Sequence, residues 1–134
     1  MERRRITSGT EWESQVGYSR AIRVENTGGG RVLVSGTTAT DDDGNVCVPG
    51  EPAEQTRIAL ENVADALREA NSGLDDVVRT RLYVTDIEMW KAVGAVHGDV
   101  FGDVQPASTL IEVEALIEPE LVVEIEAEAV VNSV

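Results

Sequence analysis

The chain has 134 residues, of which 42% are hydrophobic and 27% charged, so its composition predicts one globular domain over residues 1–134. Its 25 acidic and 11 basic residues give a net charge of −14, which repels phosphate backbones and argues against a nucleic-acid partner. No apolar run is long enough to cross a bilayer, and no signal-peptide-like segment follows the first residues. We therefore expect a cytoplasmic protein without a membrane partner.

The first half of the chain predicts two strands and one helix. Residues 19–24 and 31–36 form an expected hairpin around three successive glycines, and residues 41–51 form an expected loop rich in acidic residues, Gly and Pro. From Pro52 onward, apolar residues recur at spacings of three and four, which is typical of an amphipathic helix. Asn71-Ser72-Gly73 would end this helix.

The second half predicts a strand, a helix and two more strands. Residues 77–84 alternate, with Val78 on the apolar face and Arg81 on the other. Thr85 and Glu88 have the spacing of a capping box, and the apolar stripe of a second helix follows as far as Phe101. Strands are expected over residues 108–114 and 122–131, and the last one alternates apolar residues with glutamates.

This order of elements favours an α+β fold in which both helices pack on one face of a sheet. The second face of that sheet is then unusually crowded with charges and large side chains. It is either a plain solvated face or a surface that meets another subunit, with arginines and carboxylates paired across the boundary. Its predicted members are Arg79, Arg81, Tyr83, Leu110, Glu112, Glu124 and Glu126.

Six short stretches, which together cover nearly the whole chain, resemble the RidA/YjgF family in the order in which that family has them. They are Gly17-Tyr18-Ser19-Arg20-Ala21, Val34-Ser35-Gly36-Thr37, the helix from Gln55-Thr56 to Leu60-Glu61-Asn62, the strand from Asp76 to Asp86, Pro106-Ala107, and Val123-Glu124-Ile125-Glu126-Ala127.

The resemblance implies a chorismate-mutase-like mixed sheet, assembled as a homotrimer with three small-molecule clefts between subunits. It also implies hydrolysis of enamines and imines of the 2-aminoacrylate type to 2-keto acids and ammonia, without a metal or an organic cofactor. In that mechanism a glutamate on the last strand orients or activates water, and this role carries over to Glu124. The ligand would be a keto or imino acid.

The family's substrate-binding arginine, which follows the Pro-Ala pair, is replaced here by Ser108. A hydroxyl can bind one oxygen, but it lacks the charge and the fork that suit a carboxylate. Arg79 or Arg81 could supply the missing cation, although pairing with nearby glutamates is the more expected role for both. The predicted ligand-binding residues are Tyr18, Ser35, Gly36, Arg81, Ser108 and Leu110, with Glu124 catalytic.

Three functions remain open from the sequence. The first is a deaminase-like hydrolase of altered or reduced activity, and the second is a trimeric small-molecule binder that lost the chemistry. The third, an endoribonuclease, is disfavoured by the net charge. The only histidine, His97, lies on the apolar stripe of the second helix, so a packed, hydrogen-bonded role is expected rather than catalysis, and no metal site is predicted.

Overall fold

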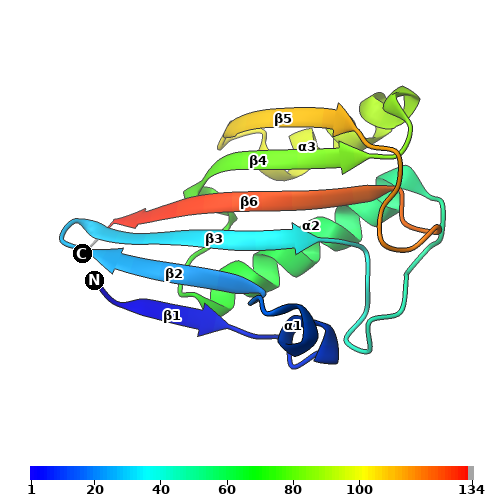
Figure 1. The fold of residues 1–134 in the computed structure, drawn as a ribbon. Coiled ribbons are helices and arrows are strands. Elements are labelled where there is room, and N and C mark those ends of the chain that lie inside the picture. Colours follow the sequence, from blue (N-terminus) through cyan, green and yellow to red (C-terminus); the bar gives the residue numbers. More distant parts are fainter. Residues whose placement is uncertain (133–134) are drawn as a thin grey trace.

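A computed structural model of the chain describes residues 1–132 and contains one six-stranded sheet (Figure 1). Its strand order is β1-β2-β3-β6-β4-β5, and each neighbouring pair is antiparallel except β4 and β5, which are parallel. The mixed sheet agrees with the predicted fold class. The strands are β1 (Arg3–Ile6), β2 (Ala21–Asn26), β3 (Gly29–Thr37), β4 (Val77–Val84), β5 (Ala107–Glu112) and β6 (Val123–Asn132).

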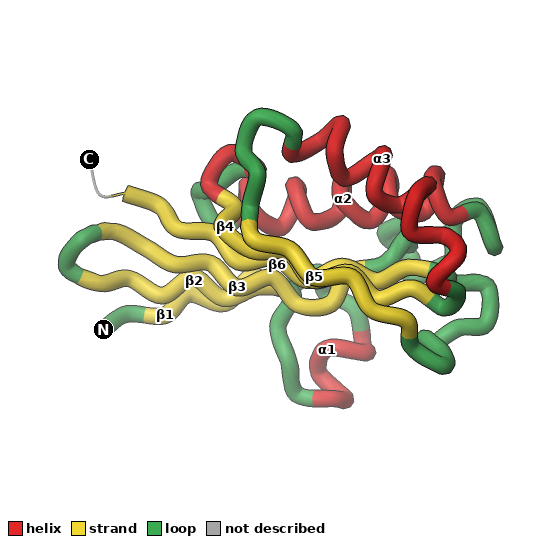
Figure 2. Tube along the Cα trace, turned by 90° about the horizontal axis from the view of Figure 1, so that it is seen from above, coloured by secondary structure: helices red, strands yellow, loops and turns green. Residues whose placement is uncertain are grey.

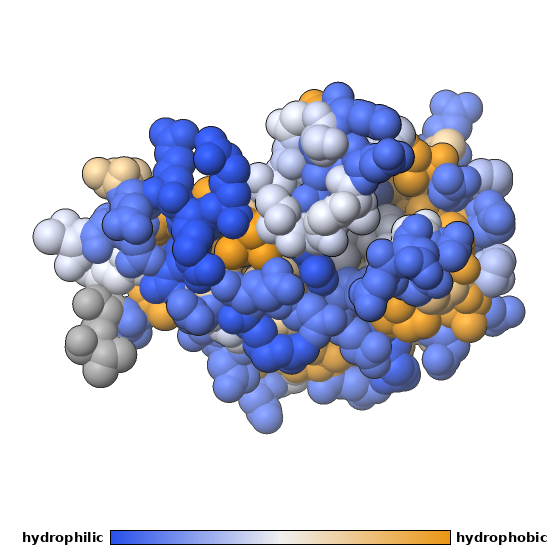
Figure 3. Space-filling model, turned by 90° about the horizontal axis from the view of Figure 1, so that it is seen from below, coloured by the Kyte–Doolittle hydropathy of each residue, from blue (hydrophilic) through white to orange (hydrophobic). Residues whose placement is uncertain are grey.

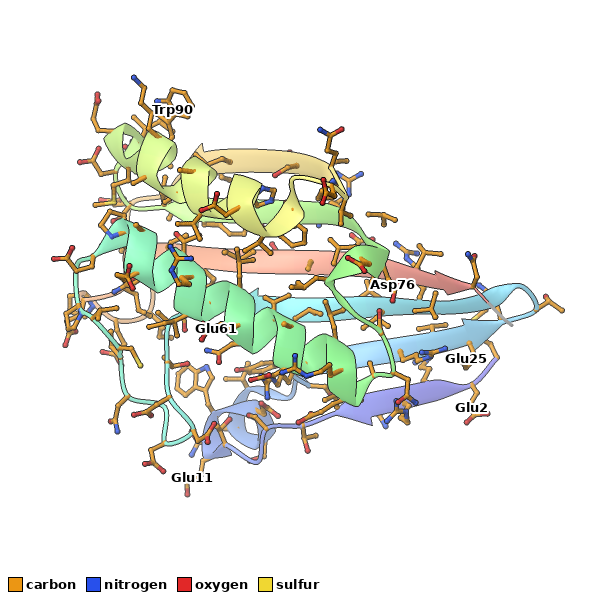
Figure 4. All side chains as sticks on the ribbon, turned by 180° about the vertical axis from the view of Figure 1, so that it is seen from behind. Glu2, Glu11, Glu25, Glu61, Asp76 and Trp90 are labelled. Atoms are coloured by element: carbon orange, nitrogen blue, oxygen red, sulfur yellow. The ribbon has the colours of Figure 1, made fainter. Side chains whose placement is uncertain are left out.

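Two long helices, α2 (Pro52–Glu69) and α3 (Trp90–Phe101), lie side by side on one face of the sheet, as predicted (Figure 2). Figure 4 shows them from behind, with Glu61 on α2 and Trp90 at one end of α3. A short helix that the sequence did not predict, α1 (Glu11–Val16), lies on the opposite side. Two 3-10 turns, η1 (Leu74–Asp76) and η2 (Ile87–Met89), precede β4 and α3.

The core lies between the helices and the sheet. The buried face of α2 includes Leu60, Val63 and Leu67, each at most 2% exposed, and β6 contributes residues such as Ile125. Burying one such side chain stabilises the fold by roughly 1.5–3 kcal/mol. Because side chains alternate along a strand, the glutamates of β6 lie on the face away from α2 and α3, here called the open face. Its other members include Arg31, Leu33, Arg81, Tyr83, Ile111 and Val130.

The helix boundaries follow local chemistry. Pro52 lies in the first turn of α2, where its missing N–H has no helical partner, and Asn71 ends that helix region with φ 57°. The capping box predicted at Thr85 is wrong. The Asp86 carboxylate caps instead, accepting a 3.0 Å hydrogen bond from the backbone N–H of Glu88, and η2 intervenes before α3 begins.

Two predicted side-chain placements are also wrong. A register irregularity between Val77 and Arg79 turns Val78 outward, so that it is 46% exposed while Val77 is buried. In β5, Leu110 pairs with Leu82 and packs against the core, so Leu110 and Glu112 lie on the helix side rather than on the open face. The open face of β5 instead carries Ala107, Thr109 and Ile111.

The surface agrees with the composition. Seen from the β1 edge, hydrophilic residues cover most of the molecule, with smaller hydrophobic patches between them (Figure 3). Among residues 1–132, no helix combines the length and the apolar character that crossing a membrane requires.

Candidate functional site

The carboxylate of Glu124 lies directly against the backbone of Gly36. Glu124 is at the start of β6, and Gly36 lies on β3 where the pairing of these strands shifts between Val34 and Thr37. A β-carbon at position 36 would collide with Glu124 Oε2. A side chain at position 36 would therefore force the Glu124 carboxylate to move, so the absence of one at Gly36 leaves the carboxylate this position.

Tyr18 and Ser35 are held near this carboxylate by the segment that follows α1. Gly17 adopts the left-handed conformation with φ 89° and ends α1, so that the chain turns into β2 with Tyr18 39% exposed. The Ser35 hydroxyl donates a 2.5 Å hydrogen bond to the carbonyl of Ser19. Ser35 thus ties β3 to the α1–β2 turn, and its hydroxyl proton is already used.

The other open-face carboxylates have partners within the chain. Glu126 accepts a hydrogen bond from the Tyr83 hydroxyl, and Glu128 lies 2.8 Å from Arg31 and 3.4 Å from Arg81. The hydrogen bond and charge of Arg31 lower the pKa of Glu128, and the bond to Glu126 raises the pKa of Tyr83. Arg81 is therefore engaged by Glu128 rather than placed against Glu124.

Glu124 is the electrostatic exception on this face. Partial burial, followed by repulsion from Glu126, raises the pKa of Glu124. Burial, with the nearby charges of Glu13 and Glu124, likewise raises the pKa of Tyr18. A partly desolvated carboxylate with a raised pKa is the kind of group that general acid–base chemistry uses to accept and return a proton.

Ser108 and Leu110 do not join this group within one subunit. Ser108 pairs with Thr80 on the helix side of β5, and Thr80 Oγ1 donates a 2.8 Å hydrogen bond to Ser108 Oγ. The predicted residues therefore lie in three places. Tyr18, Ser35, Gly36 and Glu124 gather near the α1–β2 turn, Arg81 lies further along the open face, and Ser108 and Leu110 lie behind the β5 edge.

Sequence reasoning missed Glu13, which is only 7% exposed. Its carboxylate accepts a 3.1 Å hydrogen bond from the backbone N–H of Ser8, and also a bond from the Ser8 hydroxyl. These bonds hold α1 beside a surface depression of about 530 Å³ that Glu13 and Tyr18 help to line. The helix is too short for periodicity to reveal it, so no sequence signal identified this glutamate.

Across residues 1–132, no cluster of three or more His, Cys, Asp or Glu side chains has the arrangement needed to hold a metal ion. His97 is packed and hydrogen-bonded as predicted, 2.8 Å from Thr80 Oγ1 and with its ring 4.7 Å from that of Phe101. Burial lowers the pKa of His97.

Comparisons with known proteins agree with this architecture. The family model described as Endoribonuclease L-PSP matches residues 9–131. The crystal structure of Rv2704 from Mycobacterium tuberculosis, described as a member of the YjgF/YER057c/UK114 family, has a TM-score of 0.85 and 48% identity, covering 97% of this chain and 100% of that one. SCO2049 of Streptomyces coelicolor is 36% identical over 126 residues, which are 94% of this chain and 90% of that protein. The RutC family protein UK114 of Drosophila melanogaster is also 36% identical, over 87% of this chain and 81% of its own.

Proposed function

The chain belongs to the endoribonuclease L-PSP family, which includes the RidA/YjgF proteins, and on that premise we propose that it is a homotrimer with small-molecule clefts at its subunit boundaries. We further propose that each cleft hydrolyses an imine or enamine to a carbonyl compound and ammonia. The observation that carries this proposal is the half-buried Glu124 carboxylate held against Gly36, beside Tyr18.

The exposed apolar side chains of the open face support the proposed trimer. Leu33 is 39% exposed, Ile111 45% and Val130 47%, although all three lie on a sheet face rather than on a loop. Large apolar side chains exposed on a sheet face favour a surface that another subunit covers. Covering this face would also remove more water from Glu124.

The proposed chemistry assigns one role to Glu124. Its carboxylate accepts a proton from water as the water oxygen bonds to the imine carbon, and the imine nitrogen gains a proton. In the resulting tetrahedral aminoalcohol, the hydroxyl proton passes through the Glu124 carboxylate to the amine nitrogen as the C–N bond breaks, which releases ammonia and leaves the carbonyl product. An enamine enters this sequence after protonation at carbon gives the imine. A carboxylate with a raised pKa suits both proton transfers.

The serine at position 108 favours a substrate other than the family's usual one. It also supports a second candidate function, a trimer that binds small molecules without converting them. Residues 92–112 contain no Lys or Arg, so neither β5 nor most of α3 supplies a cation for a carboxylate. Slow hydrolysis of 2-iminopropanoate is the expected result. Endoribonuclease activity is disfavoured because the net charge of −14 repels RNA.

Two measurements test the proposal. Mass photometry at micromolar concentration should give a trimer, and a stable monomer would contradict the assembly. Imines generated by an amino-acid oxidase from a panel of amino acids should be hydrolysed faster with the protein than without it. Glu124→Gln should abolish this effect, while Glu118→Gln, which removes the same charge in an exposed turn, should not. Equal rates for the wild type and Glu124→Gln would leave the binder as the better description.

A further inference from the structure

One buried amide side chain joins two loops that are far apart in the chain. Gln55 lies in the first turns of α2 and is fully buried. Its Nε2 donates hydrogen bonds of 3.1 Å to the carbonyl of Val48 and 2.8 Å to the carbonyl of Glu120. Its Oε1 accepts a 2.9 Å bond from the backbone N–H of Val122. The partners fix the orientation of the amide, because carbonyl oxygens only accept and a backbone N–H only donates.

The two loops lead away from and into the contact between Gly36 and Glu124. The loop of residues 38–51 follows β3 directly after the strand end that contains Gly36. The segment of residues 113–122 precedes β6 and ends two residues before Glu124. Both lie at the same end of the sheet (Figure 1). The amide therefore joins the chain segments on either side of the candidate site.

Strand pairing alone does not fix the contact between Gly36 and Glu124. The first residues of β6 pair regularly with β4, but the pairing of β6 with β3 is irregular between Val34 and Thr37. Gly36 lies within this irregular stretch, so no regular register sets its distance from Glu124. The amide on α2 supplies an anchor on the chain two residues before that glutamate.

The loop that follows β3 is strained where it meets the amide. Val48 has a φ of 40°, which a β-branched residue rarely adopts. Its carbonyl accepts the bond from Gln55 and a 3.2 Å bond from the N–H of Glu51. The N–H of Gly50 also donates a 3.0 Å bond to the carbonyl of Glu120. Strained residues persist only where the surroundings determine them strongly, so these bonds offset the strain and keep the loop in place.

We propose that Gln55 is a positioning residue that holds the Glu124 carboxylate against Gly36 by tying residues 38–51 to residues 113–122. Gln55 lies on the helix side of the sheet and Glu124 on the open face, so it acts through the backbone of Val122. The effect on hydrolysis rests on the function proposed above, whereas the position of the carboxylate does not.

The position is tested without any ligand. Gln55→Met removes all three bonds with a side chain of similar length, and ¹³C NMR follows the titration of the Glu124 carboxyl in the full chain. The pKa of Glu124 is raised by burial and by Glu126, so it should fall toward its ordinary value of 4.5 when the carboxylate moves into water. Thr56→Val is the matched control, because Thr56 is also fully buried on α2 but donates to the carbonyl of Pro52. It should leave the pKa of Glu124 unchanged.

A milder variant serves where Gln55→Met does not fold. Gln55→Asn keeps the amide but is one methylene shorter, so it cannot reach all three partners at once. The pKa of Glu124 should then fall by a smaller amount. A pKa that is unchanged or higher in the folded Gln55 variants overturns the proposal. An equal fall in Thr56→Val also overturns it, since the shift would then reflect a general loosening of α2.

Hydrolysis provides the second measurement. Gln55→Met should lower kcat for imine hydrolysis roughly 10- to 100-fold with little change in KM, because a misplaced carboxylate affects the chemical step more than binding. Thr56→Val should retain the wild-type kcat, and an equal loss in both variants would give Gln55 a merely structural role. A wild type without hydrolysis would contradict the proposed function. The titration of Glu124 still decides the position of the carboxylate in that case, so the two failures are distinguishable.

Discussion

The carboxylate of Glu124 occupies the space that a β-carbon at Gly36 would need. The space that the carboxylate occupies is thus left open by a residue without a side chain, on a different strand from the glutamate. Its backbone does not require glycine, because its φ lies outside the left-handed region. A substitution at Gly36 therefore acts through the carboxylate rather than through backbone strain.

Gly36→Ala should displace the Glu124 carboxylate and lower the rate of imine hydrolysis roughly 100-fold, the cost of a misplacement of about 1 Å. The free energy of unfolding should change little, because the only atoms in the way belong to the end of the flexible Glu124 side chain, which can shift. Activity assays and urea denaturation measure the two effects. Gly28→Ala is the matched control, since a β-carbon there meets open space. Unchanged activity in Gly36→Ala would show that the position of the carboxylate is unimportant.

Glu124→Gln should raise the melting temperature at pH 7 by a few degrees while abolishing hydrolysis. The folded-state pKa of Glu124 is raised by burial and by Glu126, so its contribution to stability is present below its ordinary value of 4.5 and is lost as pH rises through the folded pKa. At neutral pH the charged form is therefore unfavourable, and the neutral amide relieves it. Thermal melts from pH 4 to pH 8 should show the advantage of the variant disappearing toward low pH. A melting temperature that falls at pH 7 would contradict this account of the site.

His97 should make the fold less stable as the solution is acidified. Its pKa is lowered by burial, so the unfolded chain takes up a proton first, at its ordinary pKa of about 6.5. The contribution of His97 to the free energy of unfolding is therefore fully present above that pH, and it is lost as the pH decreases toward the folded-state pKa. His97→Gln should remove this component. The measurement is the urea midpoint of both proteins between pH 7.5 and pH 5. Carboxylates titrate alike in both, so the difference between the two midpoints reports His97 alone. A difference that stays constant with pH would contradict the prediction.

Ser108→Arg should raise the affinity for pyruvate roughly 10- to 100-fold, the range expected for one charge-assisted hydrogen bond. Because position 108 lies on the helix side of β5, the guanidinium would not face Glu124 of its own subunit and should remain free for a ligand. Calorimetry of a verified trimer measures the effect, and Ser108→Gln controls for side-chain size. No gain in pyruvate affinity would mean that the cleft does not border this edge.

The elements with long, regular hydrophobic patterns could be predicted from the sequence alone. The spacing of apolar residues predicted α2, and strict alternation predicted that the glutamates of β6 share one face, because these periods follow directly from helix and strand geometry. The family also followed from the order of short motifs, and the same motifs predicted Glu124 and Gly36 as site residues, which the structure places against each other.

The features that depend on pairing between distant segments could be seen only in the folded structure. Residues 107–112 are mostly exposed at the edge of the sheet, so their hydrophobic pattern is too weak to show which side chains face the helices, and the pairing with β4 sets this instead. Glu13 is buried because α1 folds onto the open face of the sheet. A helix of six residues is too short for its hydrophobic periodicity to predict this burial. The bond between Thr80 and His97 likewise exists only because α3 packs across β4, since hydrogen bonds between elements depend on packing and leave no trace in local sequence.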